Sequence, residues 1–506
     1  MARALVMAIL AAAAIACGQT AVRADPPPPP PTFASSGNAD FDAWRDSFAR
    51  HAVDAGRDPA VIGRLLSHIQ PDPSIVDLDQ RQPEFVSPVW DYVNNRVTTQ
   101  RINAGKALKA AMQSTLDAIQ QRYGVDSDIV LGIWGLESNF GSASLNYDAP
   151  TALATLAFEG RRRAQFEGYL MSLSQMVERQ LATPEELKSS WAGALGQPQF
   201  MPDVYLQLAV DWDGDGHRNI WDDNGDVAAS ISHYLQDRGW HTGEPVFDEV
   251  KLPADFDYSL ADGATRSIGD WMGRGLKRMD GTTWPGERVA MQSQLFLPAG
   301  AQGPALLLHP NFAVIRRYNN SDRYALVVAL LARAFEDRGG LVTSWPTQLG
   351  SLNRDQVLEL QTLLNGLNYN AGPADGLFGS ATRRAVAQFQ GDQHVTADGF
   401  PTLDLLNKVR TRAGVSVEPT PAPSSASSSP ASSASNNDAA PHPLDRVGIR
   451  ALQRRLIALG YHPGTADGSI GAATRRAIRA FQRRHSMDET GRATTDVLAA
   501  ARRAHR

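Results

Sequence analysis

The chain has 506 residues, a length that accommodates several domains of ordinary size. Hydrophobic residues make up 42% of it and charged residues 20%, which is typical of ordinary globular protein. The formal net charge of −5 argues against a general nucleic-acid-binding protein, because such proteins carry an excess of lysine and arginine.

Residues 1–24 have the pattern of an export signal. Arg3 is followed by an apolar run, residues 5–16, which is too short to span a bilayer but suits a signal peptide. Small residues before Asp25 provide a cleavage site. The only cysteine, Cys17, lies inside this leader and offers an alternative, in which it becomes a lipidated N-terminus. We therefore expect an exported, periplasmic protein, or an outer-membrane lipoprotein anchored through Cys17.

A proline-rich spacer and a long helical region follow the leader. Residues 25–36 contain six consecutive prolines, which form a stiff polyproline spacer. Residues 37–345 show repeated amphipathic helical patterns with only a few short extended segments. We expect one large, mainly α-helical domain with a minor β component.

The segment IWGLESNFG, residues 133–141, ends an apolar helix with a carboxylate. Ser127 and Asp128 are suitable N-caps for a helix over residues 129–139, and Gly141 can end it. The carboxylate is Glu137, in the last turn of that helix.

Glu137 shares one face of the predicted helix with apolar residues. Val130, Ile133 and Trp134 precede it at helical spacing. Burial disfavours a charged carboxylate and raises its pKa, so Glu137 is our candidate general acid. The alternative is a surface glutamate whose stem lies on the edge of the core.

Residues 211–226, DWDGDGHRNIWDDNGD, predict an EF-hand-like calcium loop. Aspartates alternate through a tight turn that two glycines allow, which presents several oxygens to one point, as Ca²⁺ requires. The predicted ligands are the carboxylates of Asp211, Asp213, Asp215 and Asp226 and the main-chain carbonyl of His217. Asp222, at the twelfth position of the loop, is an alternative to Asp226. A solvated acidic turn without a metal is the other interpretation.

Two internal repeats follow, related by a constant offset of 92 residues. LQTLLNGLNYNAGPADGLFGSATRRAVAQFQ (360–390) aligns without a gap with LQRRLIALGYHPGTADGSIGAATRRAIRAFQ (452–482). Each repeat predicts a small three-helix module, residues 352–410 and residues 444–506. A Ser/Pro/Ala-rich linker, residues 411–443, separates them and should be disordered. We therefore expect two independent modules rather than a stacked solenoid.

The repeats differ in charge and in their closing segments. The second contains 13 arginines and 5 acidic residues. It also has Thr490-Gly491 where the first has Asp398-Gly399. Through the pattern ADGxxGxxTRRAxxxFQ, both resemble the peptidoglycan-binding modules of cell-wall enzymes.

The larger domain resembles the lytic murein transglycosylase B family. The resemblance rests on IWGLESNFG, SWAGALGQPQFMP (190–202), the aspartate loop with NIWD, and NFAVIRRYNNSDRYALVVALLA (311–332). It implies a lysozyme-like helical catalytic domain, a structural Ca²⁺ and no organic cofactor. It also implies cleavage of the β-1,4 bond from N-acetylmuramic acid to N-acetylglucosamine in peptidoglycan glycan strands, with a 1,6-anhydro end as product.

The resemblance assigns roles to individual residues. One glutamate, here Glu137, protonates the leaving oxygen and afterwards takes the proton of the muramyl C6 hydroxyl, whose proximity replaces a bound water. The implied sugar-contacting residues are Ser190, Gln199, Tyr234, Tyr318, Asn319, Tyr324 and Tyr92. Arg162 and Arg163 match an arginine pair that could neutralise a lactyl or peptide carboxylate. The alternative functions are a hydrolytic muramidase and a catalytically silent wall-binding scaffold.

Overall fold

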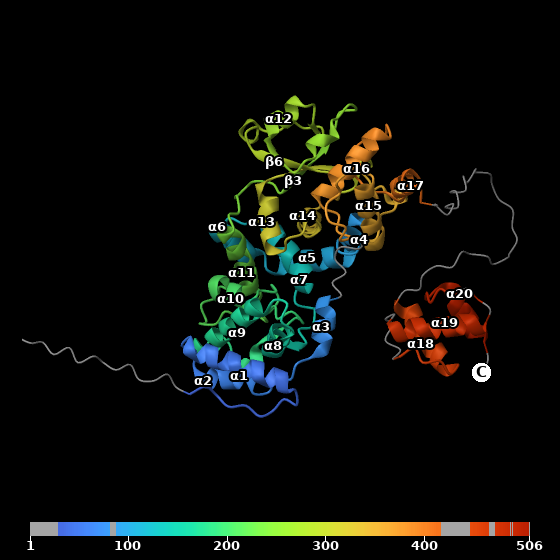
Figure 1. Ribbon diagram of the computed structural model, residues 1–506. Coiled ribbons are helices and arrows are strands. Elements are labelled where there is room, and N and C mark those ends of the chain that lie inside the picture. The colour runs from blue at the N-terminus through green and yellow to red at the C-terminus, as the bar shows by residue number, and fades with distance from the viewer. Residues whose placement is uncertain are drawn as a thin grey trace, which may run out of the picture. The chain divides into compact units, whose positions relative to one another are not determined.

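The computed structural model describes residues 29–80, 88–415, 446–464, 471–485, 487 and 489–504 (Figure 1). The predicted export signal, Cys17 and almost all of the predicted linker lie outside these residues. The chain divides into two compact units, residues 1–418 and 419–506. Within the described ranges, none of the helices is both long enough and apolar enough to cross a membrane.

The first unit begins with a mainly helical domain. Its helices up to the aspartate loop are α1 (Ala39–Asp54), α2 (Pro59–Leu66), α3 (Pro73–Gln80), α4 (Val89–Asn94), α5 (Thr99–Ala111), α6 (Gln113–Tyr123), α7 (Ser127–Ser138), α8 (Ala149–Glu159), α9 (Arg163–Glu178), η1 (Pro184–Glu186) and α10 (Pro202–Leu208). Those after it are α11 (Asn224–Asp237), α13 (Pro310–Tyr318), α14 (Asp322–Phe335) and η5 (Thr347–Leu349). A two-stranded ribbon pairs β1 (Tyr147–Asp148) with β2 (Lys188–Ser189). The mainly α-helical class that the sequence predicts is confirmed.

Helix α7 forms the centre of this domain. Nearly all of its residues before the last turn are buried, including Val130, Ile133 and Trp134 at 1%, 0% and 0% exposure. It packs against α14, which is buried along most of its length. Since a helix that is apolar on all sides must be surrounded by protein, α7 has the surroundings that its composition demands.

A separate sheet lobe is inserted between α11 and α13. Its five strands are antiparallel in the order β4 (Thr265–Ser267), β6 (Gln292–Phe296), β7 (Ala305–Leu308), β3 (Phe247–Lys251) and β5 (Lys277–Arg278). The lobe also contains η2 (Tyr258–Leu260), α12 (Ile268–Gly273), η3 (Gly286–Arg288) and η4 (Gly300–Gln302). It has its own apolar core, in which Trp271 and Leu307 are fully buried. The minor β component is therefore one compact lobe.

A buried hydrogen-bond network connects this lobe to α13. The Ser293 hydroxyl lies 2.8 Å from His309 Nδ1, and His309 Nε2 lies 3.0 Å from Asp248 Oδ2. Trp284 Nε1 also donates to Asp248 Oδ2, at 2.7 Å. Burial alone would raise the pKa of Asp248, but the bonds from His309 and Trp284 and the charge of Arg278 lower it. Asp248 is therefore a satisfied buried carboxylate.

Both repeats form three-helix modules, as the sequence predicts. Module 1 consists of α15 (Arg354–Gly366), α16 (Ser380–Asp392) and α17 (Leu403–Arg412), around fully buried Leu360 and Phe389. Module 2 consists of α18 (Arg446–Ala458), α19 (Ala472–Arg484) and α20 (Thr495–Arg503), around Leu452 and Phe481. The two modules fall in different compact units, as expected of modules that are independent of each other. Module 1 is not independent of the helical domain, because it belongs to the same compact unit and packs beside α4 (Figure 1).

We expect Asp248→Asn to lower the free energy of unfolding by about 3 kcal/mol at neutral pH, because it removes one charged partner from a buried network. The folded-state pKa of Asp248 is lowered, so its contribution is present above the unfolded-state pKa and is lost as the pH falls through the folded-state pKa. The difference in the free energy of unfolding between wild type and variant should therefore become smaller below a pH of about 4. Urea denaturation followed by tryptophan fluorescence measures this difference. Asp255→Asn, in an exposed position of the same lobe, is the control, and equal stability of all three proteins at pH 7 would contradict the role of the network.

Candidate functional site

Helix α7 carries Glu137 in its last turn, where the helix leaves the core. Asp126 is the N-cap, because its side chain accepts a hydrogen bond from the Asp128 backbone N–H. The predicted caps, Ser127 and Asp128, lie instead inside the first turn. The helix ends at Ser138, close to the predicted end at residue 139, and its C-cap is Asn139 rather than Gly141.

The backbone turns sharply directly after this helix. Asn139, Phe140 and Gly141 all have positive φ, at 50°, 57° and 78°. A Cβ on Gly141 would lie 2.5 Å from the side chain of Gln197, so glycine is required there by close packing as well as by conformation. The turn leaves Glu137 half-buried at the rim of the domain.

Tyr324, in the first turn of α14, contacts Glu137 directly. Its hydroxyl donates a hydrogen bond of 2.6 Å to Glu137 Oε1. Burial and then the charge of Glu137 raise the pKa of Tyr324 well above its ordinary value. The phenol therefore stays protonated and remains a donor to the carboxyl group.

Three aromatic residues form a wall beside this pair. The rings of Tyr234 and Tyr318 lie 4.7 Å apart, and Phe200 lies within 6.0 Å of both. The hydroxyl groups point to backbone carbonyls, Tyr318 to Pro198 and Tyr234 to Arg317, each at 2.6 Å. Burial, followed by the charge of Glu137, also raises the pKa of Tyr318. The structure thus brings Tyr234, Tyr318 and Tyr324 together with Glu137.

The loop from β2 to α10 contains Ser190 and Gln199. Ser190 Oγ accepts from the Ala194 backbone N–H at 3.3 Å. Gln199 has a positive φ of 55°, and its amide donates to the Gly196 carbonyl at 2.9 Å. Each predicted side chain is therefore held by the backbone of its own loop.

Gln197, in the same loop, is a residue that sequence reasoning missed. It is buried, and its Oε1 accepts from Trp134 Nε1 of α7 at 2.7 Å. Its amide nitrogen donates to the Trp221 carbonyl at 2.7 Å. One side chain thus joins α7 to the aspartate loop. The sequence signal that could have found it is its position inside the motif SWAGALGQPQFMP, two residues before Gln199.

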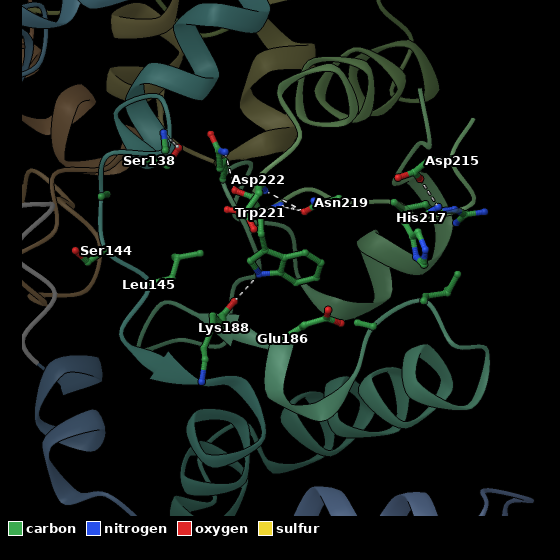
Figure 2. A pocket seen from close by; sticks show the side chains of 16 residues that line it. Ser138, Ser144, Leu145, Glu186, Lys188, Asp215, His217, Asn219, Trp221 and Asp222 are labelled. Carbon is green, nitrogen blue, oxygen red and sulfur yellow. Dashed lines mark hydrogen bonds between the residues drawn. The ribbon is translucent and has the colours of Figure 1, made fainter. Parts of the chain in front are cut away.

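A cavity of about 620 Å³ adjoins the end of α7 (Figure 2). It is lined by Ser138, the residue after Glu137, and by residues of the aspartate loop that include His217 and Trp221. Other lining residues include Leu145, Glu186 and Lys188. Figure 2 shows the Trp221 indole reaching across toward Lys188, whose carbonyl accepts from Trp221 Nε1 at 2.9 Å. No sequence pattern indicated this cavity.

The aspartate loop gathers three carboxylates. Asp211, Asp213 and Asp226 each present an oxygen within 4.8 Å of the other two. Asp226 is almost fully buried, and its two oxygens accept from the backbone N–H groups of Trp212 and Asn219, at 2.7 and 2.6 Å. Burial raises the pKa of Asp226 to about 6. This donor set suits Ca²⁺, which prefers hard oxygen ligands.

The other predicted ligands of this loop lie differently. Asp215 Oδ1 accepts from the His217 backbone N–H at 2.7 Å, which makes it part of the turn. Asp222 lies on the wall of the cavity rather than in the carboxylate cluster. Of the two candidates for the last ligand, Asp226 is the one in the cluster.

The remaining predicted residues are more dispersed. Arg162 is exposed and forms an ion pair of 2.9 Å with Asp79 of α3, and Arg163 is exposed on the first turn of α9. The described contacts tie Arg162 to α3 rather than to Glu137. Asn319 ends α13. Tyr92 is buried on α4, with the Arg96 guanidinium 3.6 Å from its ring centre.

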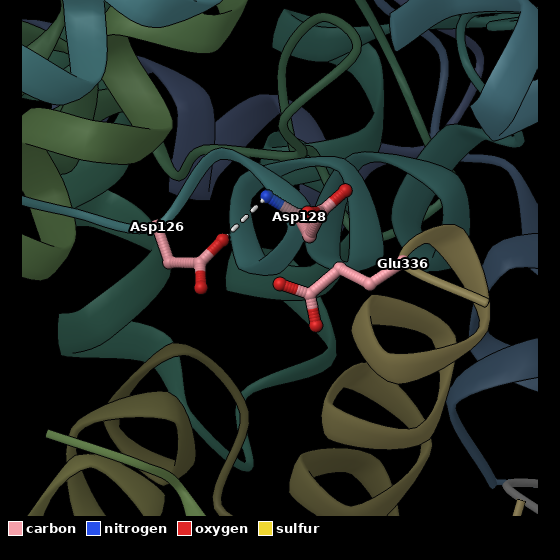
Figure 3. A group of neighbouring side chains, drawn as sticks. All are labelled: Asp126, Asp128 and Glu336. Atoms are coloured by element: carbon pink, nitrogen blue, oxygen red, sulfur yellow. Dashed lines mark hydrogen bonds between the residues drawn. The ribbon is translucent and has the colours of Figure 1, made fainter. Parts of the chain in front are cut away.

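A second acidic group surrounds the start of α7 (Figure 3). Asp126, Asp128 and Glu336 converge there, and Lys109 Nζ binds Asp128 Oδ2 at 2.6 Å. Burial, opposed by Lys109, raises the pKa of Asp128. With a lysine already in place, this group orients the start of the helix and is no candidate for catalysis.

The chain matches two protein families. Residues 40–333 match the transglycosylase SLT domain, and residues 353–409 and 445–501 match the peptidoglycan binding domain. A curated relative, the membrane-bound lytic murein transglycosylase B of Escherichia coli, is 33% identical over 278 residues, which cover 54% of this chain and 73% of the relative.

Solved structures agree with these matches. SltB3 from Pseudomonas aeruginosa, solved in complex with NAG-NAM-pentapeptide, is 41% identical, with a TM-score of 0.71 over 74% of this chain and all of that one. The soluble lytic transglycosylase SltB1 from the same organism is 30% identical, with a TM-score of 0.52 over 58% of this chain and 98% of that one. Slt35 from Escherichia coli, solved with calcium, is 29% identical, with a TM-score of 0.50 over 60% and 94%. The chain therefore belongs to the lytic transglycosylase family, as a peptidoglycan lytic transglycosylase with two peptidoglycan binding domains.

Proposed function

We propose that this lytic transglycosylase uses Glu137 as its single acid–base catalyst. The observation that carries the proposal is the hydrogen bond from the protonated Tyr324 hydroxyl to Glu137 Oε1, at the rim of a buried helix. That bond fixes the carboxyl group through one oxygen, and we assign proton transfer to the other, Oε2. A general acid must be held in this way to reach the glycosidic oxygen.

The reaction then takes two proton transfers. Glu137 Oε2 gives its proton to O4 of the leaving N-acetylglucosamine as the C1–O4 bond breaks. The muramyl C6 hydroxyl forms the new bond to C1, and its proton returns to the Glu137 carboxylate. The product is a 1,6-anhydromuramyl end, and no water is consumed. The Tyr324 hydroxyl stabilises the carboxylate between the two steps, because a donor to a charged oxygen forms a strong bond.

The predicted sugar-contacting residues fit around this centre. Tyr234 and Tyr318 supply aromatic faces, and Ser190 and Gln199 supply polar groups on the loop from β2 to α10, which contacts Tyr318 through Pro198. We propose that they hold the glycan strand across Glu137. Tyr92 on α4, Asn319 at the end of α13, and Arg162 and Arg163 at the start of α9 are proposed as further substrate contacts.

We also propose that the aspartate loop binds a structural Ca²⁺ through Asp211, Asp213 and Asp226, with Asp215 and the His217 carbonyl completing the loop. The convergence of three carboxylate oxygens supports this. Like charges brought together destabilise the folded loop unless a cation compensates them. The ion would hold the loop against α11 and, through Gln197, against α7.

The proposed domain bounds are a leader at 1–24, a spacer at 25–36, a catalytic domain at 37–345, module 1 at 352–410, a linker at 411–443 and module 2 at 444–506. The family matches support the three folded parts. An enzyme of the cell wall acts outside the cytoplasm. We propose export to the periplasm through residues 1–24, with lipidation of Cys17 as the alternative anchor.

Glu137→Gln should lower the turnover rate by at least about 10²-fold, because glutamine is nearly isosteric but cannot cycle a proton. Mass spectrometry of the soluble products released from purified sacculi measures both the rate and the chemistry. Thermal melts and sacculus pull-down should match wild type, which shows that folding and wall binding are intact. Residual activity above one tenth of wild type would remove Glu137 from the mechanism, and reducing ends in the wild-type product would indicate a muramidase.

Saturating Ca²⁺ should raise the melting temperature of the wild-type protein by several degrees relative to chelator, because a ligand that binds only the native state stabilises it. Asp213→Ala should abolish the difference, since Asp213 is exposed and contributes to the cluster but not to the core. Asp222→Ala is the matched control and should retain the difference. If calcium leaves the wild-type melt unchanged, the loop is a solvated turn.

Deleting residues 419–506, the second compact unit, should weaken retention on sacculi and slow digestion of insoluble wall. Cleavage of short soluble glycans should stay within about twofold of wild type, because the second binding site adds avidity and not chemistry. The arginine-rich composition of module 2 also predicts that retention by the full-length chain falls with salt. A truncated protein that loses activity on soluble glycans as well would contradict this division.

A further inference from the structure

Module 1 is fastened to the rest of the first unit by its closing loop, residues 398–400. Asp398 Oδ2 accepts a hydrogen bond of 2.8 Å from the Ala301 backbone N–H, in the sheet lobe. Its other oxygen, Oδ1, stays inside the module and accepts from Gln390 Nε2 and the Phe400 backbone N–H, at 2.8 and 2.9 Å. One carboxylate therefore bonds both to its own module and to the sheet lobe.

The surfaces around this bond are closely fitted. Gly300 has a φ of 67°, and a Cβ there would lie 2.5 Å from Asp398 Oδ2 and from Phe400 Cβ. The Phe400 ring packs against the core of the helical domain, with its centre 6.4 Å from that of Trp90 on α4. Contact at both the sheet lobe and α4 fixes the module at two points.

Module 2 has a counterpart of the bond between Asp398 and Gln390 inside the module, but it lacks the groups that contact the sheet lobe and α4. At the +92 positions it has Thr490 in place of Asp398 and Arg492 in place of Phe400. Thr490 Oγ1 still accepts from Gln482 Nε2 at 2.9 Å, as Asp398 Oδ1 does from Gln390. A hydroxyl has no second oxygen to take the part of Asp398 Oδ2.

The replacement of Phe400 removes the other contact as well. Arg492 is exposed, and a guanidinium cannot take the place of an aromatic ring against a buried tryptophan without a large desolvation cost. Module 2 therefore has the fold of module 1 without either of its fastening groups.

Helix α4 contacts module 1 through Trp90 and also contacts α14. It is only six residues long, so its position depends on packing rather than on its own stability. Trp90 and Tyr92 are its buried aromatic residues. The helix packs against α14, whose first turn carries Tyr324, the donor to Glu137.

We propose that the two repeats have different functions: module 1, fastened through Asp398 and Phe400, positions α4 and thereby the Tyr324–Glu137 pair, whereas module 2 is left to bind the wall. This inference rests on the role of Glu137 proposed above. Asp398 and Phe400 are positioning residues and need no contact with the glycan.

The test transfers the residues of module 2 into module 1 of the full-length chain, as Asp398→Thr with Phe400→Arg. The introduced threonine hydroxyl should keep the bond to Gln390, so α15–α17 should retain their amide hydrogen exchange. The amide hydrogen exchange rates of residues 300–302, in the sheet lobe, and of residues 89–94, in α4, should increase. On short soluble glycans kcat should fall about tenfold or more while KM changes less than about threefold, because small displacements of a catalytic group cost rate rather than affinity.

A matched variant in the other Asp-Gly loop of module 1 is the control. Asp375 and Leu377 occupy the corresponding positions there; the Asp375 carboxylate bonds only within the module, and Leu377 is exposed. Asp375→Thr with Leu377→Arg should leave kcat and the exchange of α4 unchanged.

Unchanged exchange in α4 together with wild-type kcat for the Asp398/Phe400 variant would overturn the proposal, as would an equal loss in the control. The exchange readout needs no turnover. If the wild-type enzyme formed no anhydro product, the proposed chemistry would be refuted. The exchange rates would still show whether Asp398 and Phe400 hold α4 in place.

Discussion

The burial of α7 is the constraint on which the rest of the structure depends. The helix is enclosed by protein up to its last turn, so the first polar side chain that can reach the rim is Glu137. The reversal at Asn139–Gly141 then carries the chain away and leaves the carboxyl group at that rim. Tyr324 approaches from α14, the helix that also packs most closely along α7. Position and hydrogen bonding of the carboxylate thus follow from one packing arrangement.

Polar side chains then connect this helix to its surroundings. Gln197 bonds to α7 through Trp134 and to the aspartate loop through Trp221, so one side chain connects the loop to the helix. Loss of this side chain would leave the buried Trp134 indole N–H and the half-buried Trp221 carbonyl without these hydrogen bonds. The enzyme in this way combines an apolar catalytic helix with a few fully satisfied polar contacts.

The sequence was sufficient for features that depend on local pattern. The apolar stripe predicted the buried helix that carries Glu137, the alternating aspartates predicted a turn that gathers carboxylates, and the +92 offset predicted both modules. The catalytic role of Glu137 and calcium binding by the loop stay predictions. Helix ends were less certain because Asp126, Ser127 and Asp128 are consecutive and all suitable caps; only the structure shows that Asp126 accepts the bond. Gln197 and the fastening of module 1 could not be predicted, because their partners lie far away in the chain. Composition separates the modules from the linker but does not reveal that module 1 belongs to the same compact unit as the helical domain.

The buried network of the sheet lobe has a further consequence for assigning function from geometry. Ser293, His309 and Asp248 are bonded in the order of nucleophile, base and orienting acid that serine hydrolases use. A search for catalytic triads by distance alone would therefore select this lobe. Ser293 is fully buried and His309 is 2% exposed, so no acyl group can reach the hydroxyl. In this protein, burial from substrate rather than interatomic distance shows that these three residues have a structural role and not a catalytic one.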